Sequence, residues 1–199
     1  MASDAPRSAD RRRAVLDAAL RCFARDGVEA TTIDAIRRAS GASVGSLYHH
    51  FGSKEGIAAA LYLEGLRDFH ATLLPRVEAA EDAEALVKTV VHHYVEWVVA
   101  HPEWARYLLE ARRSAGVAEA DAEIRALTRR AFARLHGHLE PFVRRGELSK
   151  VATPLLTAVL LGPAEALAAA ELRRGRLATL RAAAPVLAEA AWRALREPL

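Results

Sequence analysis

The chain has 199 residues, 52% of them hydrophobic, which is enough apolar material for a packed core of one or two domains. Its formal net charge is +3, and the whole positive excess lies in residues 1–54, which hold nine Lys and Arg against six Asp and Glu. Residues 55–199 hold nineteen of each sign, and this balance argues against a second nucleic-acid surface there. The single cysteine excludes an internal disulfide.

Composition also predicts an all-α fold. Alanine, leucine and arginine dominate, and the sparse Gly and Pro residues cluster near the ends of predicted elements. We therefore expect about nine helices and no strand. No apolar stretch approaches the ~20 residues needed to span a bilayer, and the N-terminus lacks the apolar core of a signal peptide. The sequence thus predicts a soluble, cytoplasmic protein with no membrane partner.

The first predicted helix covers about residues 10–25. Its apolar residues recur at helical spacing and are expected to face the helices that follow. These residues are Val15, Ala18, Ala19, Cys22 and Phe23, and the cysteine is expected to be a buried structural thiol. Arg11, Arg12 and Arg13 precede this apolar face. These arginines either contact the DNA backbone or an adjacent minor groove, or they form only a solvated surface.

The chain next predicts a helix, a tight turn and a second short helix. Thr31 and Thr32 are suited to cap the first of these, and Asp34 follows Thr31 at the spacing of a capping box. Gly41 is expected to end it, because glycine accepts the left-handed conformation. Ser43 is expected to cap the second helix. Two short helices joined by a Gly-containing turn are the arrangement of a DNA-binding helix-turn-helix.

A set of short motifs in this region carries a family resemblance. The motifs are Thr31-Thr32-Ile33, Ala39-Ser40-Gly41-Ala42-Ser43, Gly45-Ser46-Leu47-Tyr48, His50-Phe51 and Ser53-Lys54-Glu55. Over roughly residues 10–65 the chain resembles the DNA-binding domain of the TetR (tetracycline-repressor-like) family of transcription regulators. The resemblance implies a three-helix DNA-binding domain over residues 8–68, with its helix-turn-helix at about 31–50. It also implies a helical effector-binding and dimerisation domain over residues 69–199.

The second helix of the motif is expected to lie in the major groove. Its first residues are small, so the backbone can approach the bases, and Val44 is placed to meet a thymine methyl group. Tyr48 and Lys54 match family positions that clamp phosphates, whereas Leu47 and Phe51 are expected to anchor the helix to the core. The predicted DNA-contacting residues are Arg12, Arg13, Thr31, Thr32, Ser43, Val44, Gly45, Ser46, Tyr48, His49 and Lys54.

Six further helices are predicted after the motif. Ser53 is expected to cap the first, and Pro75 to limit it. Their approximate ranges are residues 54–74, 83–100, 102–113, 119–145, 154–174 and 179–196. Pro163 and Pro185 fall inside predicted helices and are expected to kink them or shift their boundaries.

The last two helices carry apolar stripes rich in small residues, which suit close packing in a homodimer interface. The predicted interface residues are Leu160, Ala164, Leu167, Ala168, Leu187, Ala191, Ala194 and Leu195. The alternative is that these residues form the chain's own core.

Polar and aromatic residues on apolar helix faces are the candidates for an effector pocket. They are Tyr62, Leu66, Phe69, Val90, His93, Trp97, Trp104, Tyr107 and Leu108. Such a mostly apolar pocket suits a small hydrophobic or aromatic molecule, and the alternative is plain core.

Together these features predict a homodimeric repressor that a small-molecule effector releases from a palindromic DNA operator. The alternative is a helical small-molecule-binding or protein-interaction module without a DNA role. The sequence offers no catalytic residues: it has no Gly-rich phosphate loop, no His-Glu-x-x-His run and no pair of cysteines. The paired histidines are one or two residues apart, which does not suit metal ligands on one helix face. We therefore expect no metal, no cofactor and no enzymatic activity.

Overall fold

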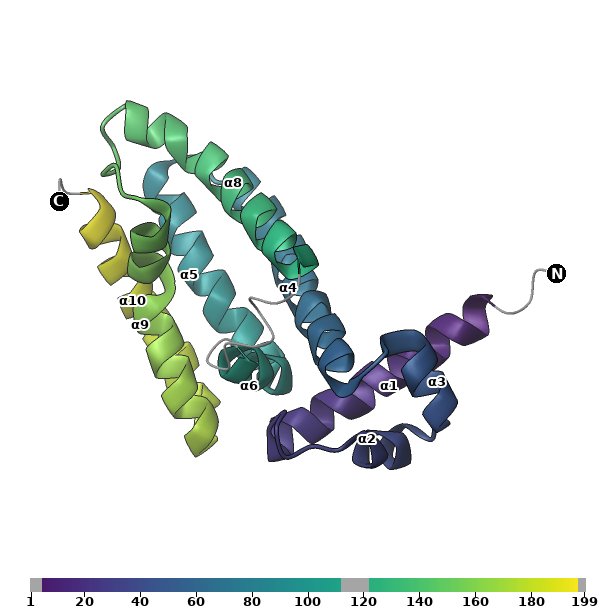
Figure 1. Cartoon of the computed structure of the whole chain (residues 1–199). Helices are drawn as coiled ribbons and strands as arrows, with labels where there is room; N and C mark the ends of the chain where they lie inside the picture. Colours follow the sequence, from purple (N-terminus) through teal and green to yellow (C-terminus); the bar gives the residue numbers. More distant parts are fainter. Residues whose placement is uncertain (1–4, 112–121, 197–199) are drawn as a thin grey trace. The chain divides into compact units, whose positions relative to one another are not determined.

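The computed structural model describes residues 5–111 and 122–196, and within these ranges it is all-α (Figure 1). The described helices are α1 (Ala5–Asp26), α2 (Ile33–Ser40), α3 (Val44–Phe51), α4 (Lys54–Glu78), α5 (Ala83–Ala100), α6 (Pro102–Ala111), α8 (Ala122–Arg144), α9 (Thr153–Arg174) and α10 (Leu177–Arg196). The all-α prediction is confirmed, and α5 has the predicted bounds. The predicted boundaries near residues 113 and 119 lie outside the described residues.

Two helices extend further than predicted. The first, α1, begins at Ala5 rather than near residue 10. The second, α4, continues through Pro75 to Glu78. Proline removes one backbone hydrogen bond, but Leu73 and Val77 on either side of it are buried, and their packing offsets that loss. Pro163 and Pro185 likewise lie inside α9 and α10.

The chain divides into two compact units, and α4 and α8 each contribute residues to both. The described part of the first unit comprises residues 5–66, 103–111 and 122–125. Its core contains the predicted apolar face of α1, including the buried thiol of Cys22. The α6 helix joins this unit because the Tyr107 ring stacks on Phe23 at 5.6 Å and its hydroxyl donates to the Ala58 carbonyl at 2.6 Å. The domain division predicted from the sequence had placed α6 with the C-terminal helices.

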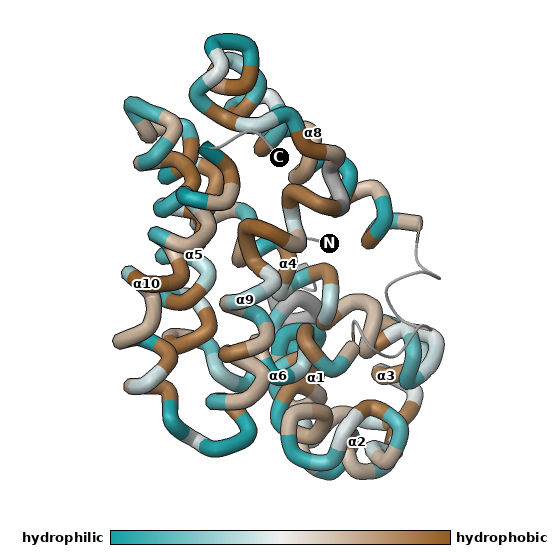
Figure 2. Tube along the Cα trace, turned by 90° about the vertical axis from the view of Figure 1, so that its left-hand side faces the viewer, coloured by the Kyte–Doolittle hydropathy of each residue, from teal (hydrophilic) through white to brown (hydrophobic). Residues whose placement is uncertain are grey.

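The second unit comprises residues 67–102 and 126–196 of the described chain, and α5 is its central helix. In this unit α5 packs against α10 and α9, which run beside it (Figure 1). Its buried residues include Leu86, Val87, Val90 and Val91. Apolar segments recur along α5 and α10, as expected for helices that pack on each other (Figure 2).

Helix α9 contradicts one expectation. An 18-residue window within Leu155–Arg174 has a mean hydropathy of 1.6, and by length and composition alone this helix is long and apolar enough to cross a membrane. The prediction that no stretch approaches this length is therefore wrong. A core helix passes the same test, and α9 packs against both α5 and α10.

Near the end of α9, hydrogen bonds from Arg176 and Arg174 hold the pKa of the buried Glu171 carboxyl below its ordinary value.

Most of the residues that were predicted to form the dimer interface belong to the core of the chain itself. Five of the eight predicted interface residues are buried within the single chain: Leu160, Ala164, Ala168, Ala191 and Leu195. Their assignment to an interface is corrected, because a buried side chain cannot meet a partner. Leu167 and Leu187 are half-buried, and Ala194 is exposed. Both α9 and α10 do expose large apolar residues, Leu155 (49%) and Val186 (72%), which were not among the predicted interface residues.

Candidate nucleic-acid interface

The helix-turn-helix is built by local caps that the sequence predicted. Thr32 is the N-cap of α2, and its hydroxyl accepts a hydrogen bond from the Ala35 backbone N–H at 3.1 Å. Gly41 ends α2 with φ of 69°, a left-handed conformation that favours glycine. Ser43 caps α3 by accepting from the Ser46 backbone N–H at 3.2 Å. These three caps fix the turn between the two helices.

The predicted capping box does not form. Thr31 is only 2% exposed, and its hydroxyl donates to the Gly27 carbonyl at 2.7 Å, so its predicted DNA contact is corrected. Asp34 instead pairs with Arg37 at 2.8 Å and Arg38 at 3.1 Å. The hydrogen bond from Arg37 is the largest of the causes that lower the pKa of the Asp34 carboxyl. The two threonines therefore have separate roles, one in the core and one at the cap.

Helix α3 has one buried side and one exposed side. Leu47 is 1% exposed and anchors the helix, as predicted. Beside it, Val44 is 48% exposed and Tyr48 is 54% exposed, and their four-residue spacing puts them on one face. Gly45 and His49 are exposed as well. Four of the predicted DNA-contacting residues therefore form one outward surface on α3.

Lys54 has a structural role that the sequence did not reveal. Its ammonium donates hydrogen bonds to the Val28 carbonyl at 2.9 Å and the Glu29 carbonyl at 3.1 Å. These bonds tie the start of α4 to the connection between α1 and α2. A lysine ammonium has three N–H donors, so one remains for the predicted phosphate contact.

We expect Lys54→Met to lower the free energy of unfolding by about 1–3 kcal/mol, because both charge-assisted hydrogen bonds are lost. Urea denaturation followed by circular dichroism would measure the change. The matched control is Arg21→Met, which removes an exposed charge from α1 in the same unit and is expected to change stability by less than about 0.5 kcal/mol. Equal effects of the two substitutions would contradict this role.

The two predicted DNA-contacting arginines of α1 have partners within the first unit. Arg12 lies over the Phe51 ring at 5.6 Å and pairs with Glu64 at 3.7 Å. Arg13 pairs with Glu64 at 3.3 Å and with Asp17 at 3.2 Å. Both side chains remain largely exposed, so these pairs are weak. Their contact with DNA stays a prediction.

The nine predicted pocket residues fall into both units. The first unit contains Tyr62, Leu66, Trp104, Tyr107 and Leu108, and the second contains Phe69, Val90, His93 and Trp97. In the second unit, the Phe69 ring centroid lies 5.1 Å from that of His93 and 5.5 Å from that of Trp97. The Trp97 indole N–H donates to Asp68 at 2.8 Å. Tyr107 and Val90 are buried core residues, and a ligand role for the set stays a prediction.

Two histidines of the second unit have a buried ring nitrogen without a partner. The Nδ1 atoms of His70 and His93 form no hydrogen bond with any described residue. Burial lowers the pKa of His70 to about 4, and burial is also the largest cause that lowers the pKa of His93. Both rings are therefore neutral at physiological pH. Among the described residues, no group of three or more His, Cys, Asp or Glu side chains is placed to hold a metal ion.

The low pKa of His70 predicts a loss of stability in acid. Above its ordinary pKa of 6.5 the ring is neutral in both states, so the full stability is present. Between pH 6.5 and about 4 the unfolded chain binds a proton that the folded chain does not, and stability falls with falling pH. The total loss is about 3 kcal/mol, and denaturation curves at several pH values would measure it.

Two variants separate the His70 contribution from the general effect of acid. His70→Gln is expected to flatten the pH dependence over this range, because the titrating group is gone. His101→Gln, which replaces an exposed histidine of the same unit, should leave it unchanged. A pH dependence that is the same in all three proteins would contradict the assignment.

Known proteins with similar sequence or structure agree with the helix-turn-helix geometry. Residues 15–61 match the sequence model of the family described as "Bacterial regulatory proteins, tetR family". The chain is 32% identical over 126 residues to the HTH-type transcriptional repressor Rv1474c of Mycobacterium tuberculosis, covering 60% of this chain and 63% of that repressor. It is 30% identical over 133 residues to the HTH-type transcriptional repressor KstR2 of Rhodococcus jostii, covering 63% and 65%. The chain thus spans less than two thirds of the length of either relative.

Solved structures share the fold over nearly the whole chain. A TetR family transcription regulator from Marinobacter aquaeolei superposes with a TM-score of 0.82 at 23% identity, covering 96% of this chain and 98% of that one. The regulator FadR from Bacillus subtilis, solved in complex with stearoyl-CoA, superposes with a TM-score of 0.74 at 18% identity, covering 90% and 96%. At these identities the likeness concerns the fold. The sequence match to the TetR family therefore covers residues 15–61, and the fold of the whole chain is similar to that of TetR family regulators.

Proposed function

We propose that the chain is a sequence-specific DNA-binding transcriptional repressor that acts as a homodimer and is released from its operator by a small molecule. The outward face of α3 carries this proposal. Val44 and Tyr48 are exposed there, on a helix that the neighbouring Leu47 anchors in the core. An exposed valine and tyrosine on the second helix of a helix-turn-helix are accessible to a DNA duplex.

In this reading α3 enters the major groove by its N-terminal end. Ser43, Gly45 and Ser46 are small and let the backbone approach the base edges. Val44 contacts a thymine methyl group and contributes to base choice. Tyr48 and the free donor of Lys54 hold the phosphates and set the register of the protein on the duplex.

One such motif reads only a few base pairs, so the proposal requires two copies. A homodimer places two recognition helices about 34–36 Å apart, or a multiple of this spacing, and so reads an inverted repeat. On α9 and α10, the exposed Leu155 and Val186, together with the predicted interface residue Ala194, remain open to a partner.

Release by an effector requires that the effector and the DNA prefer different conformations of the repressor. A ligand that favours the conformation of lower operator affinity weakens DNA binding by the same free energy with which DNA weakens ligand binding. FadR, with a similar fold, was solved with stearoyl-CoA, which supports a hydrophobic small molecule as effector. The repressor then acts in the cytoplasm on chromosomal DNA.

Substitutions at two neighbouring positions of α3 test the DNA reading. Tyr48→Ala is expected to weaken binding by about tenfold on every duplex, because a phosphate contact carries no sequence information. Val44→Ala should instead change the preferred bases. Fluorescence anisotropy on several duplexes at fixed salt measures both effects.

Both side chains are exposed, so the melting temperature of each variant should stay close to that of the parent chain. If neither substitution changes binding to any duplex, the chain is instead a helical ligand-binding or protein-interaction module without a DNA role.

A further inference from the structure

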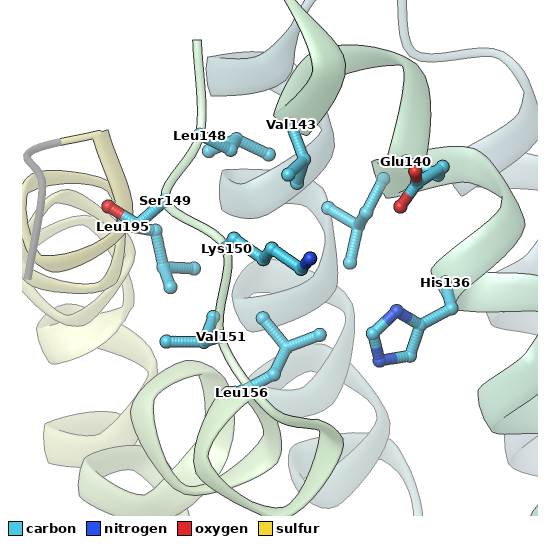
Figure 3. Close-up of a pocket in the computed structure, with 10 residues that line it drawn as sticks. His136, Glu140, Val143, Leu148, Ser149, Lys150, Val151, Leu156 and Leu195 are labelled. Carbon is cyan, nitrogen blue, oxygen red and sulfur yellow. The ribbon is translucent and has the colours of Figure 1, made fainter. Parts of the chain in front are cut away.

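A small cavity lies within the second unit, at the C-terminal end of α8 (Figure 3). Its volume is about 100 Å³, and α8, α9, α10 and the connection at residues 148–151 contribute to its walls. The apolar lining consists of Leu139, Val143, Leu148, Val151, Leu156 and Leu195. The Ser149 backbone N–H donates to the Leu195 carbonyl at 2.7 Å, which fixes the connection against the end of α10.

Two opposite charges line this apolar cavity. Glu140 belongs to α8 and Lys150 to the connection, and neither forms an ion pair or a hydrogen bond with another described residue. In Figure 3 the Lys150 side chain extends across the cavity, and its ammonium points toward the side where Glu140 and His136 lie. Both side chains are exposed to solvent, so the cavity presents a cation and an anion that do not pair with each other.

The lining restricts the ligand to a narrow chemical class. A monocarboxylate would satisfy Lys150 but leave its own charge facing Glu140, and a simple amine would meet the reverse problem at Lys150. A ligand with both charges on a short backbone satisfies the two side chains at once. The small volume, below the roughly 300 Å³ at which drug-sized pockets begin, admits only a short aliphatic tail.

We propose that this cavity binds a free aliphatic α-amino acid. The ligand carboxylate binds the Lys150 ammonium, the ligand ammonium binds the Glu140 carboxylate, and the tail packs on the leucine and valine side chains of the cavity. This site goes beyond the proposed DNA-binding function and does not depend on it, because binding is measured on the protein alone.

Isothermal titration calorimetry with three probes tests the charge requirement. The probes are L-leucine, 4-methylpentanoate and 3-methylbutylamine, which share one branched tail and carry both charges, the negative charge alone and the positive charge alone. L-leucine is expected to bind at least about tenfold more tightly than either analogue, because each analogue loses one charge-assisted hydrogen bond. Equal binding of 4-methylpentanoate would overturn the proposal in favour of a carboxylate site, and no binding of L-leucine at millimolar concentration would overturn it outright.

Variants test whether binding occurs at this cavity. Lys150→Met and Glu140→Gln are each expected to weaken L-leucine binding by about tenfold or more. Both side chains are exposed, so the variants should fold, and their melting temperatures without ligand check this. Arg130→Gln, an exposed change on α8 outside the cavity, is the matched control and should leave affinity unchanged. Equal L-leucine affinity in all variants would place the binding elsewhere and overturn the assignment, while operator binding by the same proteins would remain a separate result.

Discussion

Gly56→Ala is expected to unfold the DNA-binding unit or to destabilise it by about 4 kcal/mol or more. A Cβ atom at this position would lie 1.9 Å from the Phe51 carbonyl oxygen and 3.1 Å from its carbonyl carbon. The atoms in the way belong to the backbone at the end of α3, so no side-chain rotation relieves the clash. Relief requires α3 and the start of α4 to separate, which disturbs the recognition helix itself.

Thermal and urea denaturation of the purified variant measure this effect. Gly45→Ala is the matched control, because its Cβ would meet no atom within 4 Å and it lies in α3 of the same unit. In a helix this change is expected to be neutral or to stabilise by up to about 1 kcal/mol. Similar melting temperatures for the two variants would contradict the close approach of α3 and α4.

Leu47→Ala is expected to lower the free energy of unfolding by about 3–5 kcal/mol and to abolish specific DNA binding. Leu47 is 1% exposed and is the buried residue through which the eight-residue α3 is anchored. Its loss leaves a cavity beneath the helix and frees the outward face from its fixed orientation. A typical domain has a free energy of unfolding of only about 5–15 kcal/mol, so this substitution removes a large part of it.

The adjacent Tyr48→Ala variant supplies the contrast for Leu47→Ala. Tyr48 is 54% exposed, so its removal should weaken DNA binding without a matching loss of stability. Denaturation curves and DNA titrations on both variants give the two quantities separately. A stable Leu47→Ala protein with normal DNA affinity would show that α3 is not held as described.

Features set by neighbours in sequence could be predicted. The caps at Thr32, Gly41 and Ser43 depend on hydrogen bonds to residues at most four positions away, so the local sequence contains all the information they need. The buried and exposed sides of α3 followed from the four-residue spacing of Leu47 and Phe51.

Features that depend on distant parts of the chain could not be predicted. Lys54 binds carbonyls at Val28 and Glu29, 26 and 25 residues away, and no local pattern indicates this. Pro75 lies within α4 because tertiary packing on both sides of it offsets the lost hydrogen bond. Sequence rules consider only the local cost of proline.

The dimer prediction failed at particular residues for a related reason. Both α9 and α10 carry Ala and Leu around most of their circumference, so periodicity alone does not separate the side that packs on α5 from the side left exposed. Ala168 and Leu195 face the core, whereas Val186 does not. The cavity beside Lys150 was equally hidden, because residues from α8, α9, α10 and the connection after α8 all contribute to its walls.

The most direct test of the central claim is selection of bound duplexes from a random DNA library with the purified full-length protein, at a stated salt near physiological. The proposed repressor predicts enrichment of an inverted repeat whose half-site centres are separated by one helical turn or a multiple of it. Each half-site should lose its enrichment when Val44→Ala protein is used. A folded, dimeric protein that enriches no sequence, with or without added small molecules, would contradict sequence-specific DNA binding.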